Sequence, residues 1–220
     1  MKKISRVFKT LRILIFGWGI IVPLSYLFPL KKNLVLFIGK SRGLFFDNVK
    51  YLYLYLHRLQ RNDIKYYFLT EKKTVYNMLK QHNLPVLLHP TLRSIYALIC
   101  SNVVILCCMW NKRISFRAKK IQLWHGIGFK ILRYRTKPDA PVIAKLEAAI
   151  RGRDPIYDLF VSTSDFYTQN VFSKTMRVRN FIESGYPRND IFFEQHPDEY
   201  DLLGADKAAF ATIKELRGSG

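Results

Sequence analysis

The sequence predicts an α/β fold, a Rossmann-like parallel β-sheet with flanking helices. From residue 33 to residue 204, short apolar runs of strand length alternate with amphipathic segments of helix length. That alternation is typical of consecutive βαβ units, whose strands lie parallel in one sheet. Hydrophobic residues make up 49% of the 220 residues, which is enough to fill a core and argues against a disordered chain.

The strands are expected where short apolar runs are bounded by turn-forming residues. They fall at 34–38, 64–69, 86–88, 103–109, 120–124, 158–162 and 180–184. Helices are expected where apolar residues recur at helical spacing, at 49–59, 72–82, 92–100, 142–150 and 166–174. Asp47 and Asn48 are expected to cap the first of these helices, and Thr91 is expected to cap the third.

The first 32 residues have the character of a membrane-associating segment. An uncharged apolar run from Ile13 to Leu30 lies between two basic stretches, the second of which is Lys31 and Lys32. The run is at the short end of what can cross a bilayer, and its basic flanks suit an anionic leaflet. We expect either a single membrane anchor or a segment that lies in the headgroup layer. The alternative is a hydrophobic helix packed against the domain.

The charge of the chain predicts an anionic partner. Lys and Arg number 36 against 16 Asp and Glu, which gives a formal net charge of +20. Such a surplus suits an anionic membrane surface, a phosphate-bearing substrate or nucleic acid. We expect no nucleic acid, because the sequence holds no recognised nucleic-acid-binding motif. Cys100, Cys107 and Cys108 lie in one apolar stretch without metal-ligand spacing, so we expect small core residues, no metal and no cofactor.

The stretch that points to chemistry is Gln122–Gly126, in which an apolar strand ends in His125 and a glycine. This position predicts a histidine at the carboxyl edge of the sheet, where open α/β sheets bind ligands. Histidine suits proton transfer because its unperturbed pKa lies nearest neutrality. A buried, hydrogen-bonded structural histidine is the alternative interpretation. The basic residues that follow, among them Lys130 and Arg133, indicate either a groove for a polyanion or a solvated face.

Three other strand ends carry flexible or polar residues at the same edge. The basic loop Gly39–Gly43 lies between a strand and a helix, as phosphate cradles do, but it matches neither the P-loop nor the dinucleotide-binding pattern. Ser162 and Ser164 follow a later strand, either as helix caps or as a ligand surface. Arg188 and Asp190 follow the last strand, in a turn rich in Gly, Pro and Asn.

Three motifs, in this order, resemble those of the CDP-glycerol glycerophosphotransferase family: Gln122–Gly126, Ser162–Ser164 and Gly185–Asp190. The family contains the polymerases and primases of teichoic acids and of related phosphate-containing capsules. The stretch Lys31–Asn48 also resembles the family's first βα unit, so the likeness covers most of the chain. The resemblance implies that His125 is the catalytic base and that substrates are bound by Trp124, Gly126, Lys130, Arg133, Ser162, Ser164, Arg188 and Asp190.

The resemblance also implies a reaction and its setting. Such enzymes transfer glycerol phosphate, or a related polyol phosphate, from a CDP-activated donor such as CDP-glycerol to a lipid-linked polymer acceptor. They have two Rossmann-like halves, a GT-B-type arrangement, with the active site in the cleft between them. The implied location is the cytoplasmic face of the cell membrane, through a peripheral contact or a single N-terminal anchor. One departure is Ile127-Gly128, where the family often has Thr-Pro beside the acceptor site.

The expected domain organisation is a membrane-associating segment at 1–32, an acceptor domain at 33–204 and the start of an interdomain connection at 205–220. We expect the second domain, which in the family supplies most of the donor-binding residues, to lie outside these 220 residues. We therefore expect a glycerophosphotransferase-like N-terminal half that alone has weak activity or none. The alternative, from another functional class, is a non-catalytic membrane-bound scaffold or regulatory fragment.

Overall fold

A computed structural model describes residues 22–108, 117–126, 139–151, 155–194 and 198–205, together with residues 11, 14–15, 19–20, 208, 212 and 215. Of the predicted site residues, Lys130 and Arg133 lie outside these ranges, as do Ile127 and Gly128. Most of the expected interdomain connection and much of the N-terminal segment also lie outside them. Within the described residues, none of the helices combines the length and the apolar character needed to cross a bilayer.

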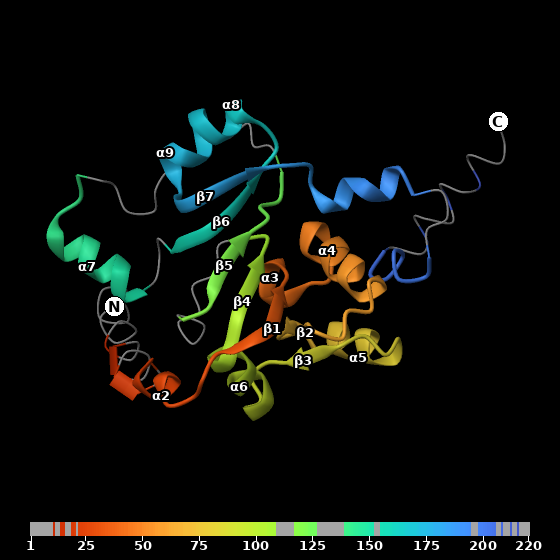
Figure 1. Cartoon of the computed structure of the whole chain (residues 1–220), viewed down its shortest axis with the longest axis horizontal. Helices are drawn as coiled ribbons and strands as arrows, with labels where there is room; N and C mark the ends of the chain where they lie inside the picture. Colours follow the sequence, from red (N-terminus) through yellow and green to blue (C-terminus); the bar gives the residue numbers. More distant parts are fainter. Residues whose placement is uncertain are drawn as a thin grey trace.

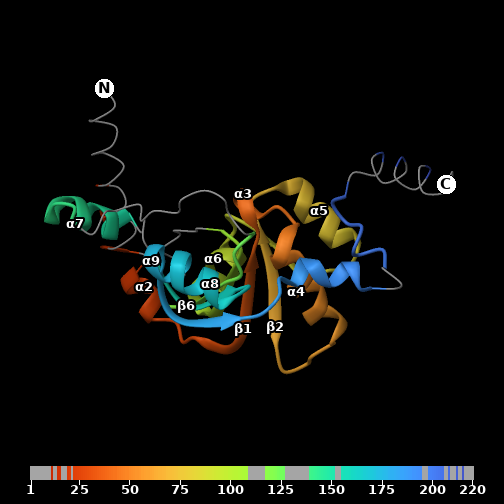
Figure 2. The same cartoon turned by 90° about the horizontal axis from the view of Figure 1, so that it is seen from above.

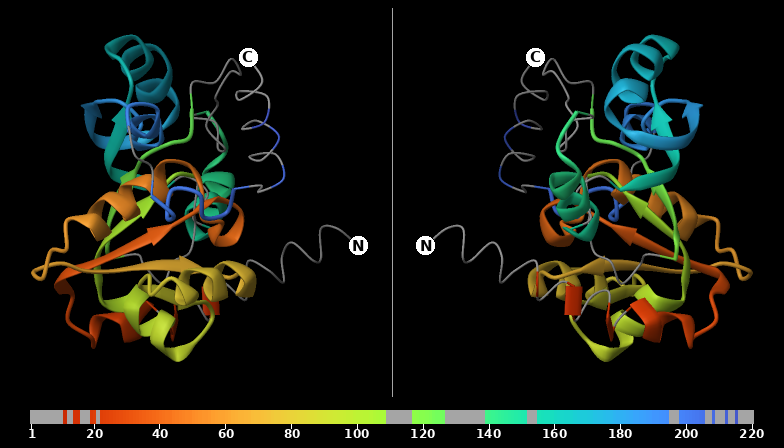
Figure 3. Two further views of the ribbon diagram at one scale, coloured as in Figure 1. Left: turned by 90° about the vertical axis from the view of Figure 1, so that its right-hand side faces the viewer. Right: turned by 90° about the vertical axis from the view of Figure 1, so that its left-hand side faces the viewer.

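The strands form one parallel sheet, as predicted (Figure 1). In the described part of the chain it has seven strands in the order β3-β2-β1-β4-β5-β6-β7. The strands are β1 Lys31–Ile38, β2 Lys65–Thr70, β3 Val86–Leu88, β4 Ser101–Leu106, β5 Lys119–Gln122, β6 Ile156–Ser162 and β7 Arg177–Glu183. Figure 3 shows the twist of the sheet, with the strand direction rotating from β2 to β6. The strand order reverses between β1 and β4, and in open α/β sheets such a switch point is where ligands bind.

Helices cover both faces of the sheet (Figure 2). One face is covered by α4 (Asp47–Arg58) and α5 (Lys73–Gln81). The other is covered by α6 (Leu92–Cys100) and by a continuous helical run made of α8, η3 and α9. The remaining bounds are α2 Val22–Tyr26, α3 Lys40–Gly43, α7 Val142–Arg151, α8 Asp165–Tyr167, η3 Thr168–Phe172, α9 Ser173–Thr175 and η4 Pro187–Phe192.

The core follows from the alternation of side chains along the central strands. In β1, Leu36 and Ile38 pack on the α6 face, whereas Phe37 packs on the α4 face. All three side chains are buried, which is why the strand reads in the sequence as a continuous apolar run. Phe37 and Phe68 both meet the ring of Tyr53 from α4 edge-on, at centroid distances of 5.4 and 5.8 Å. These contacts fix α4 on the sheet, and α4 carries site residues at its first turn.

Two sequence expectations at the carboxyl edge are wrong. The strand expected at 103–109 is β4, Ser101–Leu106, whose register with β5 ends at the pair Leu106 and Gln122, and residue 109 lies outside the described residues. The expected caps Asp47 and Asn48 lie within the first turn of α4, and Phe46 stands at the cap position without a side-chain capping bond. The Asp47 side chain contacts Arg188, and the Asn48 side chain contacts the carbonyl of Trp124. The predicted cap Thr91 is confirmed, since its side chain accepts a hydrogen bond from the Ser94 N–H.

Gly43 ends the loop that follows β1, and we expect Gly43→Ala to lower the free energy of unfolding by about 2 kcal/mol. Its φ of +92° lies in the left-handed region, and an added Cβ would stand 2.5 Å from the Thr70 Cα and 2.7 Å from the Leu69 carbonyl oxygen. Chemical denaturation followed by circular dichroism measures the change. Gly185→Ala is the matched control, because an added Cβ there meets nothing within 4 Å. Equal denaturation midpoints for the two variants would contradict the account of Gly43.

Candidate active site at the carboxyl edge of the sheet

The carboxyl edge of the sheet brings together loops that are far apart in the sequence. The loops after β1, β4 and β5 are neighbours because these strands are adjacent in the sheet. The η4 segment after β7 then returns across the edge and packs beside α4 (Figure 1). The candidate site is built from four of these segments, namely the first turn of α4, Cys107 and Cys108, Trp124–Gly126, and η4.

His125 has a fixed tautomer in this structure. Its Nδ1 lies 2.7 Å from the carbonyl oxygen of Cys107. A carbonyl oxygen can only accept a hydrogen bond, so Nδ1 carries a proton, and in the neutral form of the ring the lone pair lies on Nε2. The ring also lies against that of Trp124, with centroids 4.5 Å apart and planes 32° apart. A half-buried histidine held in this way has the geometry of a general base.

The backbone around His125 makes a tight turn. Trp124 has a left-handed φ of +57°, and Gly126 has a φ of +147°, which suits only glycine. The Trp124 N–H donates to Oε1 of Gln122 at 3.0 Å, while Nε2 of Gln122 donates to the Cys108 carbonyl at 3.1 Å. Gln122 is fully buried, and its amide therefore ties the end of β5 to the end of β4. The sequence signal for this role of Gln122 is a polar amide directly beside the apolar residues Ile121 and Leu123.

Arg188 lies beside His125. Its Nη1 donates to Oδ1 of Asp47 at 2.9 Å and to the carbonyl oxygen of His125 at 3.0 Å. The Asp47 side chain is buried and that of Arg188 is 36% exposed, so the guanidinium reaches the surface of the edge. The backbone N–H of Arg188 donates to Oδ1 of the buried Asn48 at 3.3 Å. The structure thus brings the predicted residues His125 and Arg188 together, and Asp47 and Asn48 connect them.

The other predicted residues take different positions. Trp124 is buried and packs against Phe160 and Phe172, so its indole belongs to the core of the α6 face. Ser162 is buried and donates to the carbonyl of Ser164 at 3.2 Å, while Ser164 accepts from the Tyr167 N–H at 3.4 Å. Capping is therefore the observed role of Ser164. Gly126 lies beside Arg188, since a Cβ added to it would stand 3.5 Å from Nη2, and Asp190 is exposed on η4.

Three titratable groups at the carboxyl edge, the thiols of Cys107 and Cys108 and the phenol of Tyr186, have shifted pKa values. A hydrogen bond with Cys108, together with burial, raises the pKa of the Cys107 thiol. The same hydrogen bond, together with the nearby Lys40 ammonium, lowers the pKa of Cys108. The pKa of Tyr186, whose ring lies 5.4 Å from the Arg188 guanidinium carbon, is raised by burial. Among the residues that the structure describes, no group of three or more His, Cys, Asp and Glu side chains is arranged to hold a metal ion.

This arrangement can remove a proton from an incoming hydroxyl group. With a proton on Nδ1, the neutral form of His125 has its lone pair on Nε2, and the Arg188 guanidinium lies against the His125 carbonyl. A cation near a reacting phosphate stabilises the negative charge that is spread over its oxygens. The edge therefore combines a base with an anion-binding group, as transfer of a phosphoryl group to an alcohol requires.

Comparison with known proteins shows what this chain is similar to. The model of a family described as CDP-Glycerol:Poly(glycerophosphate) glycerophosphotransferase matches residues 20–207. The solved wall teichoic acid polymerase TagF shares 18% identity over 87% of this chain and 49% of its own, with a TM-score of 0.58. A histidine-to-alanine variant of TagF shares 16% identity over 89% and 50% of the two chains, with a TM-score of 0.59.

A third TagF structure, a histidine-to-asparagine variant soaked with CDPG, shares 17% identity over 86% of this chain and 50% of that one, with a TM-score of 0.58. At these identities the similarity establishes the fold alone. The chain spans about half the length of these solved TagF chains. No curated protein matches the sequence.

Proposed function

Because the chain belongs to the CDP-glycerol:poly(glycerophosphate) glycerophosphotransferase family, we propose that it takes part in transferring a polyol phosphate from a CDP-activated donor to a lipid-linked acceptor. Glycerol phosphate is the group we assign, and teichoic acid or capsule polymer is the product. The observation that carries the proposal is His125, whose Nδ1–H donates to the Cys107 carbonyl, which leaves Nε2 as the atom that can accept a proton. That one of the related TagF structures was soaked with CDPG supports the choice of donor.

In the proposed reaction, Nε2 of His125 takes the proton of the acceptor hydroxyl as its oxygen attacks the glycerol-bearing phosphorus of the donor. A new phosphorus–oxygen bond forms, the pyrophosphate bond breaks, and CMP leaves with the electron pair of that bond. The Nδ1–H bond to Cys107 stabilises the imidazolium that forms. Arg188 lies where it would offset charge on the transferred phosphate, and Asp47 fixes its orientation.

The proposal assigns the acceptor side of the reaction to these residues. The chain spans about half the length of the solved polymerases, and a GT-B-type transferase needs a second half to bind its donor. Donor binding would then require further residues, from a longer chain or from a second polypeptide. The alternative function is a non-catalytic membrane-bound scaffold or regulatory fragment.

The test is transfer of labelled glycerol phosphate from CDP-glycerol to a lipid-linked acceptor in detergent. Once the residues that bind the donor are supplied together with this chain, we expect turnover with CDP-glycerol, slower turnover with CDP-ribitol and none with UDP-glucose. Turnover with a sugar nucleotide instead of a CDP-polyol would contradict the assigned donor class. Absence of transfer with any donor, together with retained binding to lipid vesicles, would favour the scaffold.

We place the protein at the cytoplasmic face of the membrane, through a peripheral contact or the N-terminal segment. Apolar side chains are exposed on α2, at Leu24, and on α7, where Val142 and Ile143 are 79% and 82% exposed. Both helices lie at the same end of the molecule (Figures 1 and 2). An exposed apolar surface on a chain with a net charge of +20 fits an anionic leaflet.

Ile143→Glu is expected to lower binding to vesicles of anionic lipid by at least about tenfold, because a buried isoleucine contributes about 1.5–3 kcal/mol. Flotation of the protein with vesicles measures the bound fraction. Ala144→Glu, at the exposed neighbouring position of α7, introduces the same charge without removing the large apolar side chain. Equal loss of binding in both variants would show that charge alone causes the effect, and that α7 does not insert.

A further inference from the structure

Asn48 connects three segments of the carboxyl edge through one side chain. It lies in the first turn of α4 and is fully buried. Its Nδ2 donates to the carbonyl of Trp124 at 3.0 Å and reaches that of Leu123 at 3.5 Å. Its Oδ1 accepts from the backbone N–H of Arg188 at 3.3 Å. A single amide therefore holds the loop after β5 and the η4 segment at fixed positions relative to α4.

Only an amide satisfies both partners. The side chain must donate toward the β5 loop and accept from η4. A carboxylate would place a negative oxygen against the Trp124 carbonyl, and an aliphatic side chain would leave the carbonyl and the Arg188 N–H without this partner. Buried polar groups left unpaired are costly, so the two loops would shift to find other partners.

The Trp124 peptide is the point where such a shift would matter. Trp124 has a left-handed backbone, a conformation that persists in a non-glycine residue only where the surroundings hold it. Its N–H is held by Gln122 and its carbonyl by Asn48, so both ends of the strained residue are fixed. The next residue is His125, and the direction of its side chain depends on that peptide.

The neighbouring residue, Asp47, contacts the side chain of Arg188, whose backbone N–H is bound by Asn48. Asp47 holds the guanidinium of Arg188, and the guanidinium in turn donates to the carbonyl of His125. We infer that Asn48 is a positioning residue that sets the relative placement of the His125 imidazole and the Arg188 guanidinium. This inference rests on the proposed function for the roles of His125 and Arg188, but the placement itself can be measured without activity.

The test compares Asn48→Ala and Asn48→Asp with Asn77→Ala, which removes an exposed asparagine from α5. The first measurement is the ¹⁵N-filtered NMR signal of the His125 Nδ1–H, assigned from its loss in His125→Ala. We expect proton exchange with solvent to be more than about tenfold faster in both Asn48 variants and unchanged in the control. Circular dichroism confirms that the folded fraction is the one observed.

The second measurement is transfer kinetics. A misplaced base and cation are expected to lower kcat by about 10- to 100-fold, with KM within about threefold of the wild type. Asn48→Asp nearly preserves the volume of the side chain and its acceptor for Arg188, and it replaces the donor to Trp124 with a carboxylate oxygen. If the His125 Nδ1–H exchanges with solvent no faster in Asn48→Asp than in the wild type, the assigned donation from Asn48 to Trp124 is overturned.

An unchanged Nδ1–H signal in folded Asn48 variants would overturn the inference, as would failure of both variants to fold, which would make the role of Asn48 purely structural. A changed signal in a chain whose wild type transfers nothing would support the inference and count against the proposed function. A changed signal together with the fall in kcat would support both.

Discussion

Replacing His125 with alanine is expected to lower kcat for glycerophosphate transfer by about 100- to 10,000-fold, the range that a general base contributes. The variant loses Nε2, and the Cys107 carbonyl loses the Nδ1–H that it accepts. Because the base acts on the proton as the new bond forms, kcat and kcat/KM should fall together. Initial rates measured over a range of acceptor concentrations separate the two constants.

His82 provides a matched control. It lies at the end of α5, and its Nδ1 is 2.9 Å from the carbonyl of Met78, the same type of contact that His125 makes. His82→Ala should leave kcat unchanged, because α5 covers the sheet away from the carboxyl-edge loops of β5 and β7. Retention of more than half of the wild-type kcat by His125→Ala would exclude His125 as the base.

The sequence predicts β1 well because the second half of this central strand is buried on both faces. Leu36, Phe37 and Ile38 are all buried, so β1 appears as an unbroken apolar run whichever face each side chain occupies. The position of His125 at a strand end follows from the glycine after it and from the apolar residues before it. A parallel sheet then places it at the carboxyl edge.

The contacts of the site could not be predicted, because they depend on the order of strands in the sheet. Asn48 and Trp124 are 76 residues apart, and Asn48 and Arg188 are 140 residues apart. They meet only because β4 and β5 follow β1 in the sheet and because η4 returns to α4. An Asp-Asn pair before a helix is a common capping signal. The sequence pattern therefore predicted a local cap and gave no indication of the contacts that Asn48 makes with Trp124 and Arg188.

Lys50 is a second residue whose position in the structure the local sequence pattern does not predict. A lysine near the start of an amphipathic helix is normally exposed, yet Lys50 is only 4% exposed. The segment 198–205 folds over it, and the Lys50 ammonium donates to the carbonyls of Asp201 at 2.5 Å and Leu203 at 2.8 Å. Burial lowers the pKa of Lys50 to about 8, although Asp201 and Asp198 act in the opposite direction.

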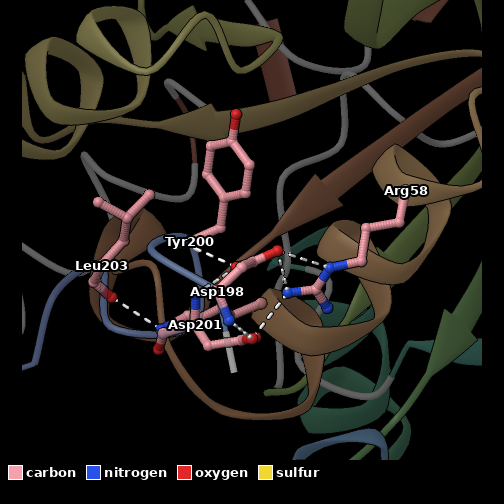
Figure 4. A network of polar contacts seen from close by, with 6 residues as sticks. Arg58, Asp198, Tyr200, Asp201 and Leu203 are labelled. Atoms are coloured by element: carbon pink, nitrogen blue, oxygen red, sulfur yellow. Dashed lines mark hydrogen bonds and ion pairs between the residues drawn. The ribbon is translucent and has the colours of Figure 1, made fainter. Parts of the chain in front are cut away.

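Arg58, at the end of the same helix, anchors the segment from a second point (Figure 4). Its Nε donates to Asp198 at 3.0 Å and its Nη2 to Asp201 at 2.8 Å. Oδ2 of Asp201 also accepts from the backbone N–H of Asp198 at 3.1 Å. The Asp201 side chain is 2% exposed and that of Arg58 is 40% exposed, so the carboxylate is the buried member of the pair.

Asp201→Ala is therefore expected to lower the free energy of unfolding by about 3 kcal/mol, at the lower end of the range for a broken buried ion pair because water reaches Arg58. The change removes the carboxylate that accepts from Arg58 and from the Asp198 N–H, and it removes one of the two carboxylates that favour the charged form of the buried Lys50. Urea denaturation with equal m-values measures the difference.

Asp63→Ala is the matched control, because Asp63 also pairs with an arginine, Arg61, but both side chains are more than half exposed. Exposed ion pairs contribute little, so its denaturation midpoint should equal that of the wild type. A midpoint for Asp201→Ala as high as that of the control would mean that the segment 198–205 is held by its apolar contacts alone. The expected difference would instead show that the ion pairs of Arg58 with Asp198 and Asp201 hold the segment 198–205 on α4.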